Sequence, residues 1–517
     1  MPRGKEVYAF LSAHPCAAAV RLRHVHLLPA PLCGLCSSPC GPFVPEHAEH
    51  RRTAAGHQGG DSAMLPQQGL DGPGVLCPAA LFQRIAGGGA KGSYQMGFWT
   101  AIRELGIDYQ ITTGSSVGAL NAALLASGNY DGGLEMWSSI TTEDIVTKTP
   151  TQLSQLIDTS GIAASLKGIM GDLANDAVNV KMDPFPLGGL LNKFFSEKEI
   201  REGGVELGIM TSEYPSLKSR PFTLAEIPFG MMEDYLLASS AVFPSMEPKN
   251  IAGVRYVDGG YSDNFPVNLA LDMGAEEIIG VRLKASGLEA KYQTNYPVRI
   301  IEPHFYLGPA MTFDPIQAQK NMVLGYNDTM RSFGRYDGAF YTFRSGETAR
   351  MSTLFGKYLE NTLVSSGCVS VSERNEFYRA LCVKAFAEAQ ERRFGRMKYE
   401  LSLLCAETAG ELFGVDPRPV YTAEEFGKAV LKAYLPLEET GRNTVFESFK
   451  NAKTLAYRMA ALKDADKRHI AAYTAYLLEG KAAKPGADRE LRALCRIAPG
   501  AFFGAIYLCF LKKGENA

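Results

Sequence analysis

Ser116 stands in the middle of the pentapeptide Gly114-Ser115-Ser116-Val117-Gly118, which has the Gly-x-Ser-x-Gly pattern of a nucleophile elbow. In such an elbow the central serine occupies a tight, strained turn between a strand and a helix. The flanking glycines keep Cβ atoms from colliding with the neighbouring backbone. The hydroxyl then projects above the sheet at a helix N-terminus, where the helix dipole favours developing negative charge. The pattern predicts a nucleophile at Ser116 and a packing role for Ser115.

The segment 87–93 reads Gly-Gly-Gly-Ala-Lys-Gly-Ser. Written as Gly87-x-Gly89-x-x-Gly92, it matches the dinucleotide-binding fingerprint, with Asp108 about twenty residues later. That acid should lie at the far end of the second strand to reach a ribose, but Asp108 lies at the near end. A phosphate loop does not fit either, because its lysine would follow Gly92 rather than precede it. Both nucleotide-binding interpretations therefore conflict with the spacing.

The same glycines also suit an oxyanion loop. Consecutive glycines let several backbone N–H groups converge on one point, and a helix that begins near Ser93 adds its positive end. We therefore expect the N–H groups of Gly88, Gly89 and Ala90 to hold the oxyanion of a tetrahedral intermediate. For Lys91 three interpretations stay open: it orients this loop, it attracts an anionic head group, or it is a solvated surface charge. A plain glycine-rich turn between strand and helix stays open as an alternative.

A third motif is Asp258-Gly259-Gly260, whose aspartate is a carboxyl that could serve as a base. Asp258 ends a short apolar strand at 253–257, and Gly259 and Gly260 then turn the chain without side chains that would crowd Ser116. A carboxylate that is shielded from water and lies within about 2.6–3.2 Å of the hydroxyl can accept its proton. The same residue would later protonate the leaving alcohol and activate water. A turn-forming aspartate before two glycines is the plain alternative.

A catalytic triad is a rival arrangement within the same reaction class. The chain order Ser116, Asp258, His304 matches that of the α/β-hydrolases. His304 lies in the segment Glu-Pro-His-Phe-Tyr at 302–306, and the only other histidine after residue 80 is His469. A lone histidine in such a segment is more often structural, but on the residues alone both the dyad and the triad stay open.

Two strand–turn–helix units must position the first two motifs. The first unit predicts a strand at 80–86 and a helix that stops at Gly106. The second unit predicts a strand at 109–113 and a helix through 119–126 that ends at Gly128. Repetition of this unit indicates an α/β fold with a parallel sheet.

Together, the glycine loop, the serine elbow and the later Asp-Gly-Gly motif resemble the patatin-like phospholipase family over roughly residues 87–328. The small-residue segment 238–241, followed by Phe-Pro, and the segment 183–187 are similar as well. The resemblance implies a three-layer α/β core with a mainly parallel sheet and a Ser116–Asp258 dyad that needs no catalytic histidine. It also implies hydrolysis of fatty-acyl esters of lipids or phospholipids through a serine acyl-enzyme, on a lipid or membrane-surface substrate and without a metal or organic cofactor. The motif positions that support these roles are Gly87, Lys91, Gly92, Gly114, Gly118, Gly259 and Gly260.

The composition bounds the organisation of the chain. Its 517 residues include 53 Lys+Arg and 55 Asp+Glu, and the net charge of −2 gives no pull toward nucleic acid. No apolar run reaches the roughly 18–20 residues of a transmembrane span. We expect an extension at 1–78, an acyl hydrolase domain at 79–330 and a helical accessory domain at 331–517. Scattered cysteines in the last part are typical of reduced thiols, so we expect a cytoplasmic protein that associates at most peripherally with membranes.

The first 78 residues differ in composition from the rest of the chain, since they hold six of the eight histidines and five of the ten cysteines. They lack a hydrophobic period that could build a core, so we expect a disordered or non-native extension. The alternatives are a secretory signal, or a metal site with the ligands Cys33, Cys36, Cys40, His47 and His50.

Several further helices are expected, none of which carries a catalytic motif. A stripe of Ile162, Leu166, Ile169 and Leu173 at helical spacing predicts a helix that packs on the core or forms a lid. Later helices are expected near 370–385, after a capping box at Thr422, and at 445–462, 467–479 and 501–511. The last of these is apolar enough to dock on protein or membrane.

Two other classes of function stay open. Gln83 and Arg84 depart from the aliphatic pattern of a buried first strand, which would suit a non-catalytic lipid-binding protein on the same fold. A dinucleotide-dependent oxidoreductase would use the 87–92 loop for a pyrophosphate.

Overall fold

The computed structural model describes residues 81–85, 88–145, 147–150, 180–183, 185–366, 401–450, 452, 454–480 and 487–515. The chain divides into two units, Met1–Gly74 and Val75–Ala517, and all described residues belong to the second. The predictions for the extension, for Gly87, for the stripe at 162–173 and for the helix at 370–385 therefore lie outside the described residues.

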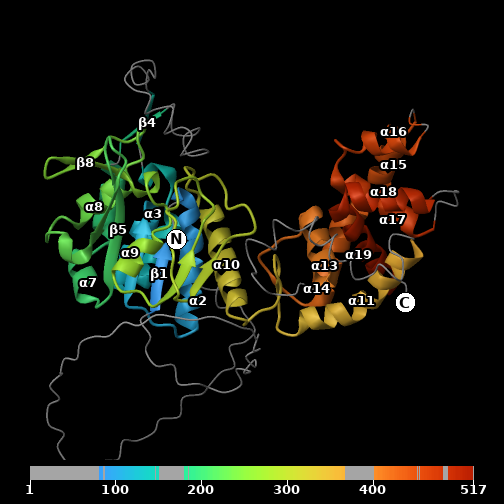
Figure 1. The fold of residues 1–517 in the computed structure, drawn as a ribbon, viewed down its shortest axis with the longest axis horizontal. Helices are drawn as coiled ribbons and strands as arrows, with labels where there is room; N and C mark the ends of the chain where they lie inside the picture. The colour runs from blue at the N-terminus through green and yellow to red at the C-terminus, as the bar shows by residue number, and fades with distance from the viewer. Residues whose placement is uncertain are drawn as a thin grey trace, which may run out of the picture. The chain divides into compact units, whose positions relative to one another are not determined.

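A central sheet forms the core of the α/β part (Figure 1). Its strand order is β10-β9-β1-β2-β5-β8-β7, and β6 pairs with β5. The strands from β10 to β5 in this order are parallel, whereas β6 and β8 run antiparallel to β5, and β7 runs antiparallel to β8. The expected α/β fold with a central sheet is confirmed. The strand bounds are β1 Leu81–Ile85, β2 Ile111–Ser115, β5 Glu206–Glu213, β6 Ser219–Thr223, β7 Lys249–Ile251, β8 Val254–Asp258, β9 Glu277–Val281 and β10 Val298–Ile301.

Helices cover both faces of this sheet. Successive residues of a strand point to opposite faces, and Ile278 and Ile279 of β9 lie in different core clusters. Ile279 packs with α2 (Ser93–Glu104) and α10 (Pro315–Ser332), which lie side by side in Figure 1. Ile278 packs with α9 (Val267–Asp272) instead. The sheet is therefore enclosed between two helical layers.

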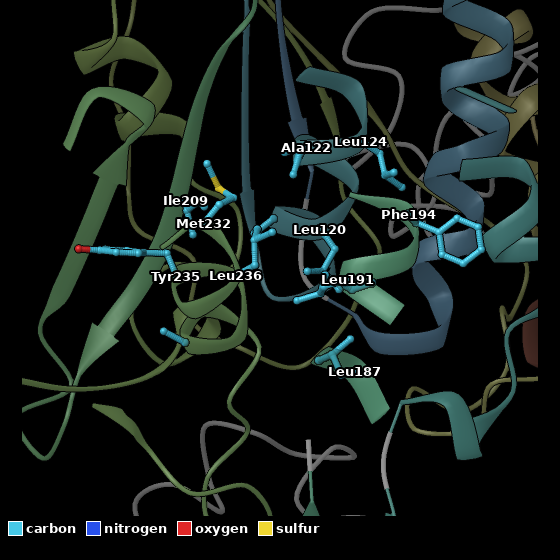
Figure 2. Packing of buried hydrophobic residues seen from close by; sticks show 14 of the residues in the cluster. Leu120, Ala122, Leu124, Leu187, Leu191, Phe194, Ile209, Met232, Tyr235 and Leu236 are labelled. Atoms are coloured by element: carbon cyan, nitrogen blue, oxygen red, sulfur yellow. The ribbon is translucent and has the colours of Figure 1, made fainter. Parts of the chain in front are cut away.

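A core cluster joins α3 (Val117–Ser127), α6 (Phe185–Phe194) and α8 (Met232–Ser239) to β5. Figure 2 shows side chains of this cluster in the space between these elements, and each fully buried aliphatic side chain contributes about 1.5–3 kcal/mol. Because α3 starts directly after Ser116 and α8 ends at Ser239, this packing fixes both helix ends. The side chains labelled in Figure 2 are Leu120, Ala122, Leu124, Leu187, Leu191, Phe194, Ile209, Met232, Tyr235 and Leu236.

The second strand lies two residues later than predicted. The sequence indicated 109–113, whereas β2 spans Ile111–Ser115. Gly114 belongs to the strand rather than to the turn, because it pairs with both neighbouring strands. A Cβ on Gly114 would lie 2.1 Å from the carbonyl oxygen of Gly118, so glycine is required where the elbow folds back over the strand.

The described residues after 346 are mainly helical, and they form one hydrophobic cluster together with Ala339, Phe340, Tyr341 and Phe343. The predicted capping box is confirmed at the start of α14. Thr422 Oγ1 accepts the N–H of Glu425 (3.1 Å), and Glu425 Oε2 accepts the N–H of Thr422 (2.8 Å). The helix bounds are α11 Glu347–Ser365, α13 Leu401–Leu412, α14 Ala423–Tyr434, α15 Glu438–Ser448, α16 Leu455–Ala461, α17 Lys467–Leu478, α18 Ala487–Ile497 and α19 Pro499–Glu515.

The prediction of one helix at 445–462 is wrong, because α15 ends at Ser448 and α16 begins at Leu455. Phe449 and Ala452, which lie in the segment that connects the two helices, are buried. Thr454 then caps α16 by accepting the N–H of Tyr457 at 3.4 Å. The predicted helix at 467–479 is confirmed by α17.

The apolar C-terminal helix is α19, which packs mainly against α13 and α17. Phe502, Ile506 and Leu508 are fully buried in the cluster of this part. Its apolar side chains are thus covered by protein. Within the described ranges, no helix has the length and apolarity needed to cross a membrane.

The remaining elements are short. Strands β3 and β4 form an antiparallel pair, and β11 and β12 form a parallel one. Their bounds, with those of two further helices, are β3 Thr147–Pro150, β4 Val180–Asp183, β11 Thr342–Phe343, β12 Val420–Tyr421, α4 Tyr130–Ser139 and α7 Glu197–Glu202.

Candidate active site

Ser116 occupies the turn between β2 and α3 in a strained backbone conformation. Its φ of 56° and ψ of −134° lie where a residue with a Cβ is rarely found, at a cost of about 1–3 kcal/mol. Residues 111–115 and 117–120 are buried, whereas Ser116 is partly exposed. The Ser116 N–H donates to Ser239 Oγ at 3.0 Å, which ties the turn to the end of α8. This is the geometry of a nucleophile elbow.

Strand β5 lies between β2 and β8 and thereby sets the separation of Ser116 and Asp258. Ser115 pairs with Met210 of β5. Asp258 pairs with Thr211, the next residue of the same strand. Ser116 and Asp258 therefore flank one level of β5 from opposite sides, with their backbones about two strand spacings of 4.7–4.9 Å apart. At that separation two side chains that lean over β5 can meet.

Asp258 is a buried carboxyl at the end of β8, with 2% of its surface exposed. Its N–H donates to the carbonyl of Ala241 at 2.9 Å, and its Oδ1 accepts the N–H of Gly260 at 2.7 Å. Burial raises the pKa of Asp258 from 3.8 to about 6, and the neighbouring Ser116 hydroxyl and Gly260 N–H act in the opposite direction. Among the described residues, Oδ2 has no hydrogen bond of standard geometry. The contact between Asp258 and the Ser116 hydroxyl is thus looser than a formed hydrogen bond.

The glycine loop lies beside these two residues. Gly88 and Gly89 line the same cavity as Ser116, and a 3₁₀ turn at Gly89–Gly92 leads into α2. The φ of Gly89 is +56°, and a Cβ there would lie 2.1 Å from the carbonyl oxygen of Ala310. That same oxygen accepts the N–H of Ala90 at 2.7 Å. In this conformation the Ala90 amide is occupied, so of the three predicted donors Gly88 and Gly89 remain.

Asn121 of α3 joins the glycine loop to the elbow helix, and sequence reasoning missed it. Its Nδ2 donates to the carbonyl of Gly92 at 3.1 Å and to Gln95 Oε1 at 2.7 Å. Its Oδ1 accepts the indole N–H of Trp137 at 2.9 Å. All three bonds are buried, so the glycine loop and the turn at Ser116 are held in a fixed relation. An asparagine inside an apolar helix was the available signal.

One cavity contains the reactive groups. Ser116 and Asp258 line it together with Gly88, Gly89 and Gly260. An apolar lining of this kind excludes water and suits a hydrocarbon chain. The apolar side chains in the walls are Val117, Leu120, Met136, Trp137, Ile140, Ile145, Leu187, Leu190, Val242, Met246, Met311 and Phe313. The other polar residues are Ser240, Asn264 and Ser286.

The structure does not bring His304 to this cavity. Its Nε2 lies 3.1 Å from Glu411 Oε1, and its ring stacks on Phe340 with a centroid distance of 3.9 Å. His304 is also absent from the residues that line the cavity around Ser116. The triad hypothesis therefore has no geometric support. Asp108, the acid of the dinucleotide hypothesis, precedes β2 and so lies at the opposite end of that strand from the elbow.

Comparisons with known proteins bear on the same region. Residues 85–271 match the family model described as patatin-like phospholipase. Patatin-like phospholipase domain-containing protein 7 of Rattus norvegicus is 24% identical over 211 residues, which are 40% of this chain and 14% of that protein. Lysophospholipase nte1 of Aspergillus terreus is 26% identical over 212 residues, which are 40% of this chain and 12% of that protein. The matched region thus spans only a small part of these curated relatives.

A solved structure is also similar. The crystal structure of VipD from Legionella pneumophila matches with a TM-score of 0.29 and 13% identity, over 82% of this chain and 91% of that chain. A score of this size does not establish a common arrangement.

Proposed function

We propose that this chain, whose residues 85–271 match the patatin-like phospholipase family model, hydrolyses fatty-acyl esters of lipids or phospholipids. Ser116 is the nucleophile and Asp258 is the base of a two-residue site. The observation that carries the proposal is a strained serine and a buried carboxyl in one apolar cavity.

The reaction follows from the positions of these groups. Ser116 Oγ attacks the ester carbonyl and gives its proton to Asp258. The N–H groups of Gly88 and Gly89 hold the oxyanion, and loss of one such donor typically costs about 10²–10³ in rate. Asp258 then passes the proton to the leaving alcohol. In the second half, water attacks the acyl-enzyme and gives a proton to Asp258, which returns it to Ser116 as the fatty acid leaves.

A carboxylate can replace the usual histidine here because of its surroundings. An aspartate with a pKa near 4 is a weak base at neutral pH, and proton transfer is most efficient when the pKa of the base is close to the working pH. Burial raises the pKa of Asp258 to about 6, which brings it near that condition. The Gly260 N–H still supports the ionised form through Oδ1, so the carboxylate is available at neutral pH.

We further propose that residues 79–330 form the acyl hydrolase domain, a three-layer core with a mainly parallel sheet. Residues 331–517 then form a helical accessory domain. The proposal is supported by the separate hydrophobic clusters of the two regions. No step of the mechanism requires a metal or an organic cofactor.

Labelling with a fluorophosphonate probe tests the assignment. We expect the wild-type protein to be labelled and Ser116→Ala to be unlabelled and inactive on a p-nitrophenyl ester. Ser115→Ala is the matched control, because this neighbouring serine is buried and does not line the cavity. It should keep both labelling and hydrolysis. A folded wild-type protein that is not labelled, or labelling that persists in Ser116→Ala, would contradict the proposal.

A further inference from the structure

A short segment at the end of α8, residues 239–241, touches the backbones of both the nucleophile and the base. Ser239 Oγ accepts the Ser116 N–H at 3.0 Å and donates to the carbonyl of Met210 at 2.8 Å. Two residues later, the carbonyl of Ala241 accepts the Asp258 N–H at 2.9 Å. The residue between these two contacts is Ser240, which is therefore held next to both partners of the dyad.

The Ser240 side chain is polar and buried, and its hydroxyl has no hydrogen-bond partner among the described residues. Only 9% of the residue is exposed, and it lines the cavity that contains Ser116 and Asp258. Its Oγ makes no hydrogen bond with any part of the chain that the structure describes. A buried hydroxyl left in this state typically costs about 1–3 kcal/mol relative to a satisfied one. A molecule that enters the cavity can supply the missing partner.

Other unpaired hydroxyls differ in their location. Thr113 Oγ1 and Ser115 Oγ are likewise buried and unpaired within the described residues, but neither residue lines the cavity. Ser240 alone of these three combines an unpaired hydroxyl with access to the reacting groups.

We propose that Ser240 is a third catalytic residue, whose hydroxyl hydrogen-bonds the oxygen that exchanges a proton with Asp258. In acylation that oxygen belongs to the leaving alcohol, and in deacylation it belongs to the attacking water. These two oxygens occupy one position, because deacylation is the reverse of acylation with water in place of the alcohol. The inference rests on the proposed function and adds one contact to it.

The proton balance of the reaction is unchanged by this contact. The proton moves from Ser116 to Asp258 and then to the alcohol oxygen, and in the second half from water to Asp258 and back to Ser116. Ser240 neither gains nor loses a proton. Its hydroxyl orients the alcohol or water oxygen toward the carboxyl, which is a positional contribution worth about one hydrogen bond.

Ser240→Ala tests the contact. Because this change removes an unsatisfied hydroxyl, we expect the melting temperature to stay the same or rise. We expect kcat/KM on a p-nitrophenyl or lipid ester to fall about tenfold, which corresponds to one lost hydrogen bond. Labelling of Ser116 by a fluorophosphonate should continue at nearly the wild-type rate, because departure of fluoride needs no oxygen to be protonated. Ser240→Thr, which keeps the hydroxyl, should recover most of the ester activity.

The control is Thr113→Val, which removes from strand β2 another buried hydroxyl that has no partner among the described residues and does not line the cavity. It should leave kcat/KM unchanged. Wild-type kcat/KM in Ser240→Ala would overturn the inference while the proposed function stands. Equal losses of labelling rate and ester turnover would also overturn it, because they would indicate damage to the elbow. A wild-type protein that neither reacts with the probe nor hydrolyses esters would instead refute the proposed function itself.

Discussion

Replacing Asp258 by Asn should abolish hydrolysis and at the same time stabilise the protein at neutral pH. The physical reason is the cost of ionising a buried carboxyl. In the folded chain burial raises the pKa of Asp258 to about 6, whereas an exposed aspartate in the unfolded chain keeps a pKa near 3.8. Between these two values the folded state keeps a proton that the unfolded state has lost. Folding stability therefore falls as the pH rises from about 4 to about 6.

The expected gain in stability of Asp258→Asn follows from the pKa shift of Asp258. A difference of roughly two pKa units corresponds to about 3 kcal/mol, which is the largest gain expected from Asp258→Asn at pH 8. Asparagine has nearly the same shape and keeps an acceptor for the Gly260 N–H, but it carries no charge. Near pH 4 the carboxyl is protonated in the folded wild-type protein, so this charge-dependent gain should vanish there.

Urea unfolding followed by tryptophan fluorescence suits this measurement. The chain has two tryptophans, Trp99 and Trp137, and both are buried in the cluster around the candidate active site. Their emission therefore reports the α/β part that contains Asp258. The free energy of unfolding would be measured for both proteins at several pH values between 4 and 8, and the difference between the two proteins would be plotted against pH.

The difference between the two proteins isolates Asp258. Glu407, a buried carboxyl whose pKa is raised to about 7, also makes stability depend on pH, but it is present in both proteins and cancels. We expect the difference to grow in favour of the asparagine variant as the pH rises through 4 to 6. A difference that does not change with pH, or one that turns against the variant at pH 8, would refute the assignment of a raised pKa to the buried Asp258 carboxyl.

Three further outcomes are expected. In a steady-state ester assay, kcat/KM should rise with pH and level off above about 6, because Asp258 must be ionised to accept a proton; a rate that is flat from pH 4.5 to 8 would contradict this. Gly89→Ala should lower kcat by about 10²–10³ without unfolding the protein, because the new Cβ would lie 2.1 Å from the carbonyl oxygen of Ala310 and would displace the oxyanion loop. Circular dichroism would check that the variant is folded. His304→Ala should keep wild-type kcat/KM, because its imidazole pairs with Glu411 outside the cavity, and complete loss of activity in a folded variant would restore the triad hypothesis.

The sequence was most informative where chemistry depends on a few adjacent residues. The elbow around Ser116 is a local pattern, since Gly114 must be glycine because of its contact with the carbonyl oxygen of Gly118, four residues later. The start of α14 was predictable for the same reason, because its capping box needs only Thr422 and Glu425. The register of β5 with its two neighbouring strands brings Ser116 and Asp258 together, and this register cannot be derived from the sequence. The pairing of the two residues was therefore predicted from the resemblance to a family.

Features that depend on distant contacts could not be predicted. The N–H of Ala90 was expected to hold an oxyanion, but the carbonyl of Ala310, far along the chain, accepts it. The helix expected at 445–462 is interrupted where Phe449 turns into the core and packs against Tyr473 of α17, a contact between residues that are distant in the sequence. Nothing in the sequence distinguishes Ser240 from other small residues. That its hydroxyl has no hydrogen-bond partner among the described residues can be recognised only from the structure.

Two features of the site are energetically unfavourable, the strained backbone of Ser116 and the ionised, buried carboxyl of Asp258. The same hydrophobic cluster stabilises both. Strain at Ser116 costs about 1–3 kcal/mol, and ionising the buried Asp258 at neutral pH costs about 3 kcal/mol. Burial of two or three aliphatic side chains offsets this sum, at about 1.5–3 kcal/mol each, and the cluster around α3 and α8 contains more than that. Because α8 ends in the segment 239–241, which bonds to the backbones of both residues, the packing that stabilises the fold also holds the nucleophile and the base in register. In the proposed dyad, the sheet and this segment position the proton acceptor, and the proposed mechanism uses no histidine for that purpose.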